Sequence, residues 1–189
     1  YYVMGAVGEE GAPGNVWRTA DDFPPAAKSV SMFLAADGLL TPKAPTNETG
    51  STSLISDPRH PMEIPGTSFP GAADASAFEK QAEVRTFTTT VIESPIEWTG
   101  RSGAELFRSS TAPDTVVIVR VSDVYPDGLS ILIVDYPQRL RYRDGLDHEV
   151  MLKPGQVAKV AFDVGWISQI FNKGHRIRVT VSSTGAPLY

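Results

Sequence analysis

Cysteine is absent from this chain of 189 residues. Disulfide bonds, thiolate catalysis and cysteine metal sites are therefore excluded together. The absence of cysteine does not identify the cellular compartment, because many secreted bacterial proteins also lack cysteine. We expect a soluble protein that is either cytoplasmic or secreted. The sequence starts at Tyr1 without an initiator methionine or an apolar leader, so we expect a processed or excised piece.

Long runs of one kind of residue are absent too. Apolar runs are short, such as the four residues 116–119, whereas a membrane-spanning helix needs about 18. Basic residues form no long run, and 17 Lys and Arg against 22 Asp and Glu give a net charge of −5. Nucleic-acid backbones attract positive surfaces. We therefore expect neither a membrane nor a nucleic acid as a partner.

The sequence also lacks the signatures of catalysis. The G-x-S-x-G elbow that presents the nucleophile of an α/β-hydrolase does not occur, and the nearest approaches, at residues 50–53 and 100–103, have a different spacing. His60, His148 and His175 are too widely separated to form a zinc motif. We therefore predict no catalytic residue, no metal and no cofactor in this chain.

Glycine and proline, by contrast, are plentiful. The 16 Gly and 15 Pro are spread along the chain and are not concentrated in one segment. Short segments of alternating polarity between frequent turns are typical of β-sandwiches and barrels. We predict an all-β fold, an antiparallel two-sheet jelly-roll sandwich over residues 1–189, with a loop-rich segment over residues 1–80 and regular strands over residues 84–183.

The strongest strand signal is at residues 114–125, which carry apolar side chains on both faces, as a central strand does. Pro126-Asp127-Gly128 then turns the chain into a partner strand over residues 129–136. Further strands are expected at residues 1–4, 31–36, 84–88, 95–98, 103–109, 157–164 and 175–183, and loops at residues 41–52 and 57–77. Composition favours a helix over residues 73–83 and allows a helical turn around residues 168–171.

Two histidine contexts invite a functional interpretation. In Asp57-Pro58-Arg59-His60-Pro61 the prolines stiffen a loop that could present Arg59 or His60 to a ligand, although a rigid surface loop is the simpler interpretation. His175 is expected on the apolar face of its strand, as a hydrogen-bonded structural residue rather than a catalytic base.

Arginines and tryptophans offer two more patterns. Arg139, Arg141 and Arg143 alternate with apolar residues, which predicts three guanidinium groups on one strand face, either docking anions or balanced by nearby acids. The three tryptophans, Trp17, Trp98 and Trp166, could form a platform for sugars, although burial in the core is their commoner use.

Several short motifs, each weak alone, combine in order into a family resemblance. They run from Asp22-Phe23-Pro24-Pro25 through Asp57-Pro58-Arg59-His60-Pro61, Ile96-Glu97-Trp98-Thr99-Gly100 and Ala112-Pro113-Asp114-Thr115 to Asn172-Lys173-Gly174-His175-Arg176 and Ser182-Ser183. Together they resemble the C-terminal domain of the X-Pro dipeptidyl-peptidase family, which includes cocaine esterase, α-amino acid ester hydrolase and glutaryl-7-aminocephalosporanic acid acylase types. The resemblance covers essentially the whole chain.

The resemblance implies a galactose-binding-like jelly roll attached to an α/β-hydrolase domain that precedes it in the same polypeptide. The family's catalytic Ser, Asp and His belong to that other domain, and none maps onto this chain. The implied role is to pack on the catalytic domain, shape its substrate entrance and contribute to a homo-oligomer. Met32 and Phe33 resemble the part that approaches the acyl pocket, with burial in the sandwich core as the alternative. The family continues past Ser182-Ser183 into a final strand, which we expect to be missing here.

Two functions from different classes remain open at this point. The first is a non-catalytic domain of a serine hydrolase, whose substrate could be an X-Pro peptide, a β-lactam acyl group or a simple ester. The second is a carbohydrate-binding module, which would show two or more coplanar, exposed aromatic rings on one sheet face.

Overall fold

The computed structural model describes residues 1–46, 50–63 and 73–186, and in this part of the chain nearly all regular structure is β. The strands are β1 (Tyr2–Val3), β2 (Val16–Trp17), β3 (Phe33–Leu34), β4 (Leu40–Thr41), β5 (Arg85–Thr88), β6 (Ile96–Arg108), β7 (Val116–Val124), β8 (Ser130–Arg139), β9 (Ala158–Phe171) and β10 (Arg176–Ser182). One short α-helix, α1 (Ser76–Glu79), and one 3₁₀ turn, η1 (Leu140–Tyr142), complete the described part. The all-β prediction is confirmed.

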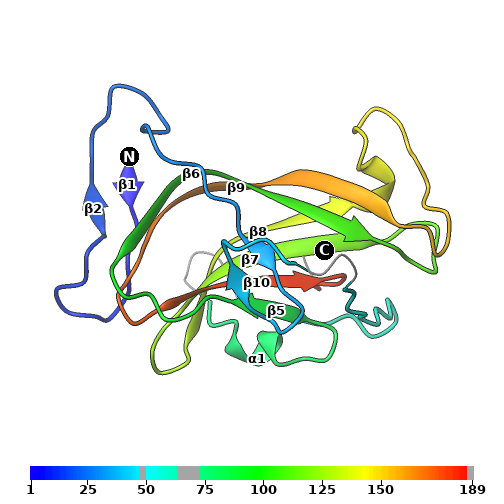
Figure 1. The fold of residues 1–189 in the computed structure, drawn as a ribbon, viewed down its shortest axis with the longest axis horizontal. Coiled ribbons are helices and arrows are strands. Elements are labelled where there is room, and N and C mark those ends of the chain that lie inside the picture. Colours follow the sequence, from blue (N-terminus) through cyan, green and yellow to red (C-terminus); the bar gives the residue numbers. More distant parts are fainter. Residues whose placement is uncertain (47–49, 64–72, 187–189) are drawn as a thin grey trace.

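Two antiparallel layers enclose the core (Figure 1). One is a four-stranded sheet in the order β5-β10-β7-β8, and the other pairs β6 with β9 over their full lengths. Alternate side chains of β7 and β9 point between the layers, where they pack with β10 and β5. The buried cluster includes Val117, Val119, Val121, Val160, Val164, Ile167, Phe171, Ile177 and Val181. This arrangement is the sandwich predicted from the period-two pattern.

Strand β7 occupies the central position predicted for it, because both of its neighbours are strands and both of its faces are covered. On its outer face Arg120 is buried beneath α1, with its guanidinium carbon 4.6 Å from the centre of the Phe78 ring. Phe78 forms a small second cluster with Met62 and Val84. The segment before β5 therefore closes the outer face of the four-stranded sheet.

The helix predicted over residues 73–83 is wrong in length, since α1 has only four residues. Before it, Asp74 forms an antiparallel bridge to Ile131 of β8: the Ala75 amide donates to the Ser130 carbonyl at 2.7 Å, and the Leu132 amide donates to the Ala73 carbonyl at 3.1 Å. A residue in a β-bridge has extended dihedrals and cannot also belong to the helix. Tertiary pairing therefore overrides the helix propensity of this segment.

Two further predictions about elements are wrong near β6 and β9. Residues 168–171 are the end of β9 and not a helical turn, because they pair with residues 96–99 of β6. The two strands expected at residues 95–98 and 103–109 are a single strand, in which a register shift at Ser102/Gly103 absorbs the irregularity. The predicted loops at residues 41–52 and 57–77 include residues 47–49 and 64–72, which lie outside the described residues.

The first 25 residues, called here the N-terminal arm, project from one end of the sandwich (Figure 1, blue). The arm contains β1 and β2, which pair with each other. Its base joins β9 through two backbone hydrogen bonds of 2.8 Å, from the Met4 amide to the Ser168 carbonyl and from the Ile170 amide to the Met4 carbonyl. At the opposite end, the segment between β8 and β9 forms a second projection (Figure 1, yellow to orange).

Candidate functional site

Met32 and Phe33 lie at the surface beside β5. Phe33 begins β3, which pairs with β4, and β4 is preceded by Leu39, which bridges to Thr88 at the end of β5. Leu34 packs against the core cluster, whereas Phe33 is half-buried and Met32 is 38% exposed. Because successive residues of a strand face opposite sides, Leu34 takes the inward position and Phe33 faces away from the core.

Arg59 and His60 are presented on a tight turn that is organised by Asp57. The Arg59 side chain donates two hydrogen bonds to the Asp57 carboxylate, at 2.9 and 2.8 Å, and the Arg59 amide donates a third at 3.0 Å. These bonds, followed by one from His60, hold the pKa of Asp57 well below its usual range. Both presented side chains are highly exposed.

The structure does not bring these two predicted pairs together. The Asp57 turn lies beside the segment after β10, where the Met62 amide donates to the Thr184 hydroxyl at 3.1 Å and the Ala186 amide donates to the Met62 carbonyl at 2.8 Å. Met32 and Phe33 lie near Thr88, which pairs with Arg178 at the other end of the β5–β10 ladder. The two pairs therefore mark separate places on the surface.

His175 is fully buried between two carboxylates. Its Nδ1 lies 2.8 Å from an oxygen of Asp123 and its Nε2 lies 2.8 Å from an oxygen of Glu9, while its ring packs against Tyr125 at 4.3 Å between centroids. Burial raises the pKa of Asp123. At Glu9 burial works in the same direction, but hydrogen bonds from Asn172 and His175 outweigh it and the pKa of Glu9 is lowered. The prediction of a hydrogen-bonded structural histidine is confirmed.

This arrangement leaves His175 no role as the base of a serine nucleophile. A triad histidine faces a carboxylate with one ring nitrogen and a hydroxyl with the other, whereas both nitrogens of His175 face carboxylates. Elsewhere in the described residues, no hydrogen bond joins a serine or threonine hydroxyl to a histidine ring.

The described residues contain neither a metal-ligand cluster nor a membrane-spanning helix. No group of three or more His, Asp or Glu side chains there could hold a metal ion. No helix in the same ranges is long and apolar enough to cross a membrane.

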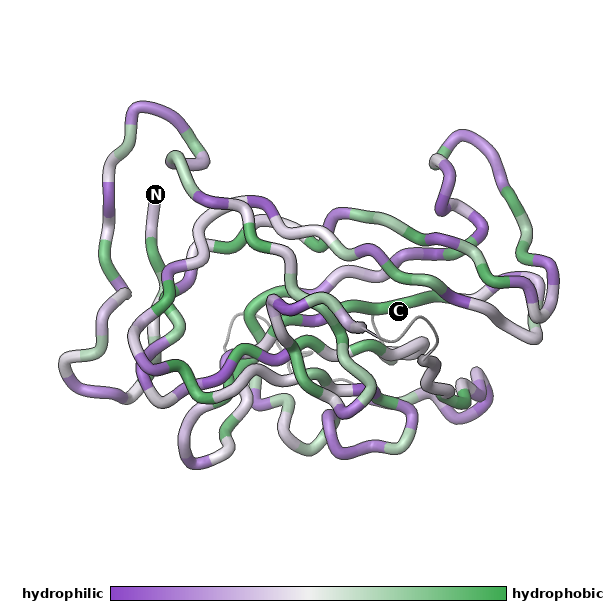
Figure 2. The backbone as a smooth tube through the Cα atoms, in the orientation of Figure 1, coloured by the Kyte–Doolittle hydropathy of each residue, from purple (hydrophilic) through white to green (hydrophobic). Residues whose placement is uncertain are grey.

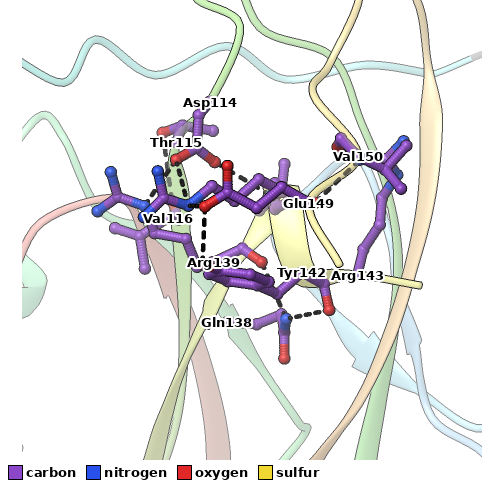
Figure 3. Close-up of polar contacts among 11 residues, drawn as sticks. Asp114, Thr115, Val116, Gln138, Arg139, Tyr142, Arg143, Glu149 and Val150 are labelled. Atoms are coloured by element: carbon purple, nitrogen blue, oxygen red, sulfur yellow. Dashed lines mark hydrogen bonds and ion pairs between the residues drawn. The ribbon is translucent and has the colours of Figure 1, made fainter. Parts of the chain in front are cut away.

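The three arginines at the end of β8 and just beyond it do not form the predicted strand stripe. Only Arg139 belongs to β8, and the chain then coils into η1. Figure 3 shows the resulting network: the Arg139 Nε donates to Asp114 at 2.7 Å, and Glu149 accepts a hydrogen bond from the Tyr142 hydroxyl at 2.7 Å. The Arg143 guanidinium turns back to the Leu140 and Val150 carbonyls. These arginines are balanced by acids and carbonyls, as the simpler interpretation predicted.

The tryptophans correct another expectation. Only Trp98 packs against the core, whereas Trp17 is 79% exposed and Trp166 is 54% exposed. The two exposed rings belong to different sheets. Trp17 packs against Tyr2 with an interplanar angle of 65°, and Trp166 packs against Phe23 with an interplanar angle of 41°. They therefore do not form the coplanar platform on one sheet face that a sugar-binding module requires.

Sequence reasoning missed the clamp that holds the base of the N-terminal arm. Besides His175, Glu9 accepts a 2.7 Å hydrogen bond from the Asn172 amide, and the Val7 amide donates to the Tyr125 hydroxyl at 2.8 Å. Glu9 and His175 are 166 positions apart. The signal in the sequence was Asp123, an acidic residue in the mostly apolar strand β7, since a buried ionisable group requires a partner.

The known proteins that this chain resembles include an esterase, an aminopeptidase and an ester hydrolase. A cocaine esterase of Rhodococcus sp. (strain MB1 Bresler) is 32% identical over 189 residues, covering 92% of this chain and 33% of the relative. An aminopeptidase of the marine sediment archaeon Thaumarchaeota archaeon superposes with a TM-score of 0.85 at 26% identity, over 93% of this chain and 32% of that one. An α-amino acid ester hydrolase shares the fold, with a TM-score of 0.80 at 24% identity and coverages of 93% and 32%.

This chain therefore spans about a third of the length of these relatives. The model of one family, described as the X-Pro dipeptidyl-peptidase C-terminal non-catalytic domain, matches residues 1–189. The chain thus belongs to the family of X-Pro dipeptidyl-peptidase C-terminal non-catalytic domains.

Proposed function

We propose that this chain is the C-terminal domain of a serine hydrolase that acts on ester or amide bonds, and that an α/β-hydrolase domain precedes it in the same polypeptide. The family match over all 189 residues carries the proposal. The length of the relatives supports it, since about two thirds of each relative lies outside the matched part. The parent enzyme would form an acyl-enzyme intermediate on a serine of the other domain.

In this proposal residues 1–189 act as one β-sandwich domain that packs on the catalytic domain and shapes its substrate entrance. Met32 and Phe33 would contribute an apolar wall to the entrance, because both are large and at least partly exposed, and Phe33 is held in the β3–β4 pair. Arg59 and His60 would contact substrate or the catalytic domain from the Asp57 turn. None of these residues would transfer protons to substrate.

The proposal is tested by the reading frame upstream of Tyr1. We expect a G-x-S-x-G elbow there, and a frame without one would overturn the proposal. On a chromogenic ester, the isolated 189-residue chain is expected to show no hydrolysis above buffer. The longer polypeptide should hydrolyse the same ester and lose that activity when the elbow serine is changed to alanine.

The entrance role is tested separately in the longer polypeptide. Phe33→Ala and Met32→Ala should raise KM by about three- to tenfold with little change in kcat, because they remove apolar contact made equally in ground and transition states. Leu146→Ala is the matched control, since Leu146 is equally apolar and highly exposed on the far projection. An unchanged KM in both variants would refute the proposal that Met32 and Phe33 line the substrate entrance.

A further inference from the structure

The N-terminal arm displays an unusual amount of apolar side chain to solvent. Of the seventeen large hydrophobic residues that are exposed among the described residues, six fall within its 25 residues: Tyr2, Met4, Val7, Val16, Trp17 and Phe23. In Figure 2 short hydrophobic segments alternate with hydrophilic ones along the arm. A concentration of exposed apolar side chains marks an interaction site in many soluble proteins.

Ring contacts connect the arm to the outer face of β9. Tyr1 packs on Phe23 at 5.6 Å between centroids, and Phe23 packs on Trp166 at 5.5 Å. On the arm itself Tyr2 packs on Trp17 at 5.4 Å. Beside these rings lies a groove of about 340 Å³, lined among others by Tyr1, Arg18, Pro25 and Glu97. Of these rings Tyr1 lines the groove. Exposed aromatic side chains are frequent anchors of protein interfaces.

The arm is also held rigidly, which a docking element requires. Its base is fixed by the clamp at His175 and by the pairing of Met4 with β9. Farther along, the Arg18 guanidinium forms an ion pair with Glu97 of β6 at 2.5 Å. A surface that is ordered before binding loses less conformational entropy when its partner arrives. The hydrogen bonds around His175 thus hold the base of the segment that carries the exposed rings.

We propose that the N-terminal arm and Trp166 form the docking surface for the catalytic domain of the same polypeptide, with Trp17 and Trp166 as its anchors. This inference rests on the proposed function. The family is described as C-terminal, so in a relative the catalytic part precedes this domain along the chain, on the side of the arm, where Tyr1 packs on Phe23. A tethered partner is present at an effective concentration of about millimolar. The exposed rings of the arm lie on the side of the domain to which the tethered catalytic domain is connected.

The test is hydroxyl-radical footprinting of the longer polypeptide against the isolated 189-residue chain. Trp17 and Trp166 should be modified readily in the isolated chain and lose most of that modification in the longer polypeptide. Phe107 is the matched internal control, because it is 68% exposed on β6 and lies six residues along that strand from Arg101, the partner of Trp166, or about 20 Å away. Its rate should be the same in both proteins.

Variants extend the test. Trp166→Ala and Trp17→Ala should each restore modification of the other tryptophan in the longer polypeptide, whereas Phe107→Ala should not. Unfolding midpoints of the isolated chain should be nearly unchanged by all three, since each side chain is exposed. Equal modification of Trp17 and Trp166 in both proteins would overturn the docking surface.

The outcomes separate this inference from the proposed function. A longer polypeptide that hydrolyses ester while Trp17 and Trp166 stay fully reactive would refute the docking surface alone. A reading frame without a nucleophile elbow would refute the proposed function itself. Concentration-dependent protection of both tryptophans in the isolated chain, with dimers in sedimentation, would assign the surface to a second copy of this chain and overturn the proposal.

Discussion

Replacing His175 with alanine tests whether the buried clamp stabilises this fold. The substitution removes two hydrogen bonds of 2.8 Å, one to Asp123 and one to Glu9. Asp123 is only 1% exposed, so its carboxyl group would lose its hydrogen-bond partner without gaining water. Glu9 is partly exposed, and water can replace the lost bond there. The cost therefore arises mainly at Asp123.

The size of the effect follows from that burial. Leaving a buried polar group without its hydrogen-bond partner costs about 1–3 kcal/mol. Each kcal/mol lowers the unfolding midpoint of a domain of this length by about 2–4 °C. We therefore expect His175→Ala to lower the midpoint by roughly 2–12 °C.

The assay is thermal and urea unfolding of the 189-residue chain, with His148→Ala as the matched control. His148 also pairs with an aspartate, Asp147, but both side chains are exposed. Its loss should change stability by less than about 0.5 kcal/mol. In a double-mutant cycle, Asp123→Ala with His175→Ala should cost clearly less than the two single changes together. A loss below about 1 kcal/mol for His175→Ala, or an additive cycle, would refute the reasoning.

Two further predictions concern the N-terminal arm. Glu9 has a lowered pKa, so its contribution to stability is present above the unfolded pKa and is lost as pH falls through the folded one. Glu9→Gln should therefore reduce the loss of stability against urea between neutral and acid pH. An unchanged dependence of that stability on pH would contradict this. Gly14 has φ of 106°, and a Cβ there would lie 2.7 Å from the Gly5 Cα. Gly14→Ala should therefore cost about 1–3 kcal/mol, measured by unfolding against Gly8→Ala, where φ is also positive but no atom lies within 4 Å.

Local signals predicted the regular half of the fold well. Alternation and turn residues located β7 and β8 together with the turn between them, and Gly128 has the positive φ of 94° that its place in that turn requires. The same reasoning failed where pairing partners decided the structure. Residues 168–171 extend β9 because β6 supplies their hydrogen bonds, and no local propensity encodes that supply.

The candidate site shows the same division. The motif around Asp57 could be interpreted from sequence as a stiff turn, because its hydrogen bonds join residues two or three positions apart. The exposure of Trp17 could not be predicted, since β2 has only two residues and offers no period from which an inward or outward face could be inferred.

By itself the sequence determined the all-β class, the central strand β7, the missing nucleophile elbow and, through ordered motifs, the family. These depend on composition, on period-two patterns and on contacts between near neighbours, which a linear chain carries directly. Only the tertiary structure decided that Glu9 meets His175 and that Phe23 leans on Trp166. Such contacts join residues more than a hundred positions apart, and their geometry exists only after the sheets have packed. The docking surface proposed here belongs to that second group.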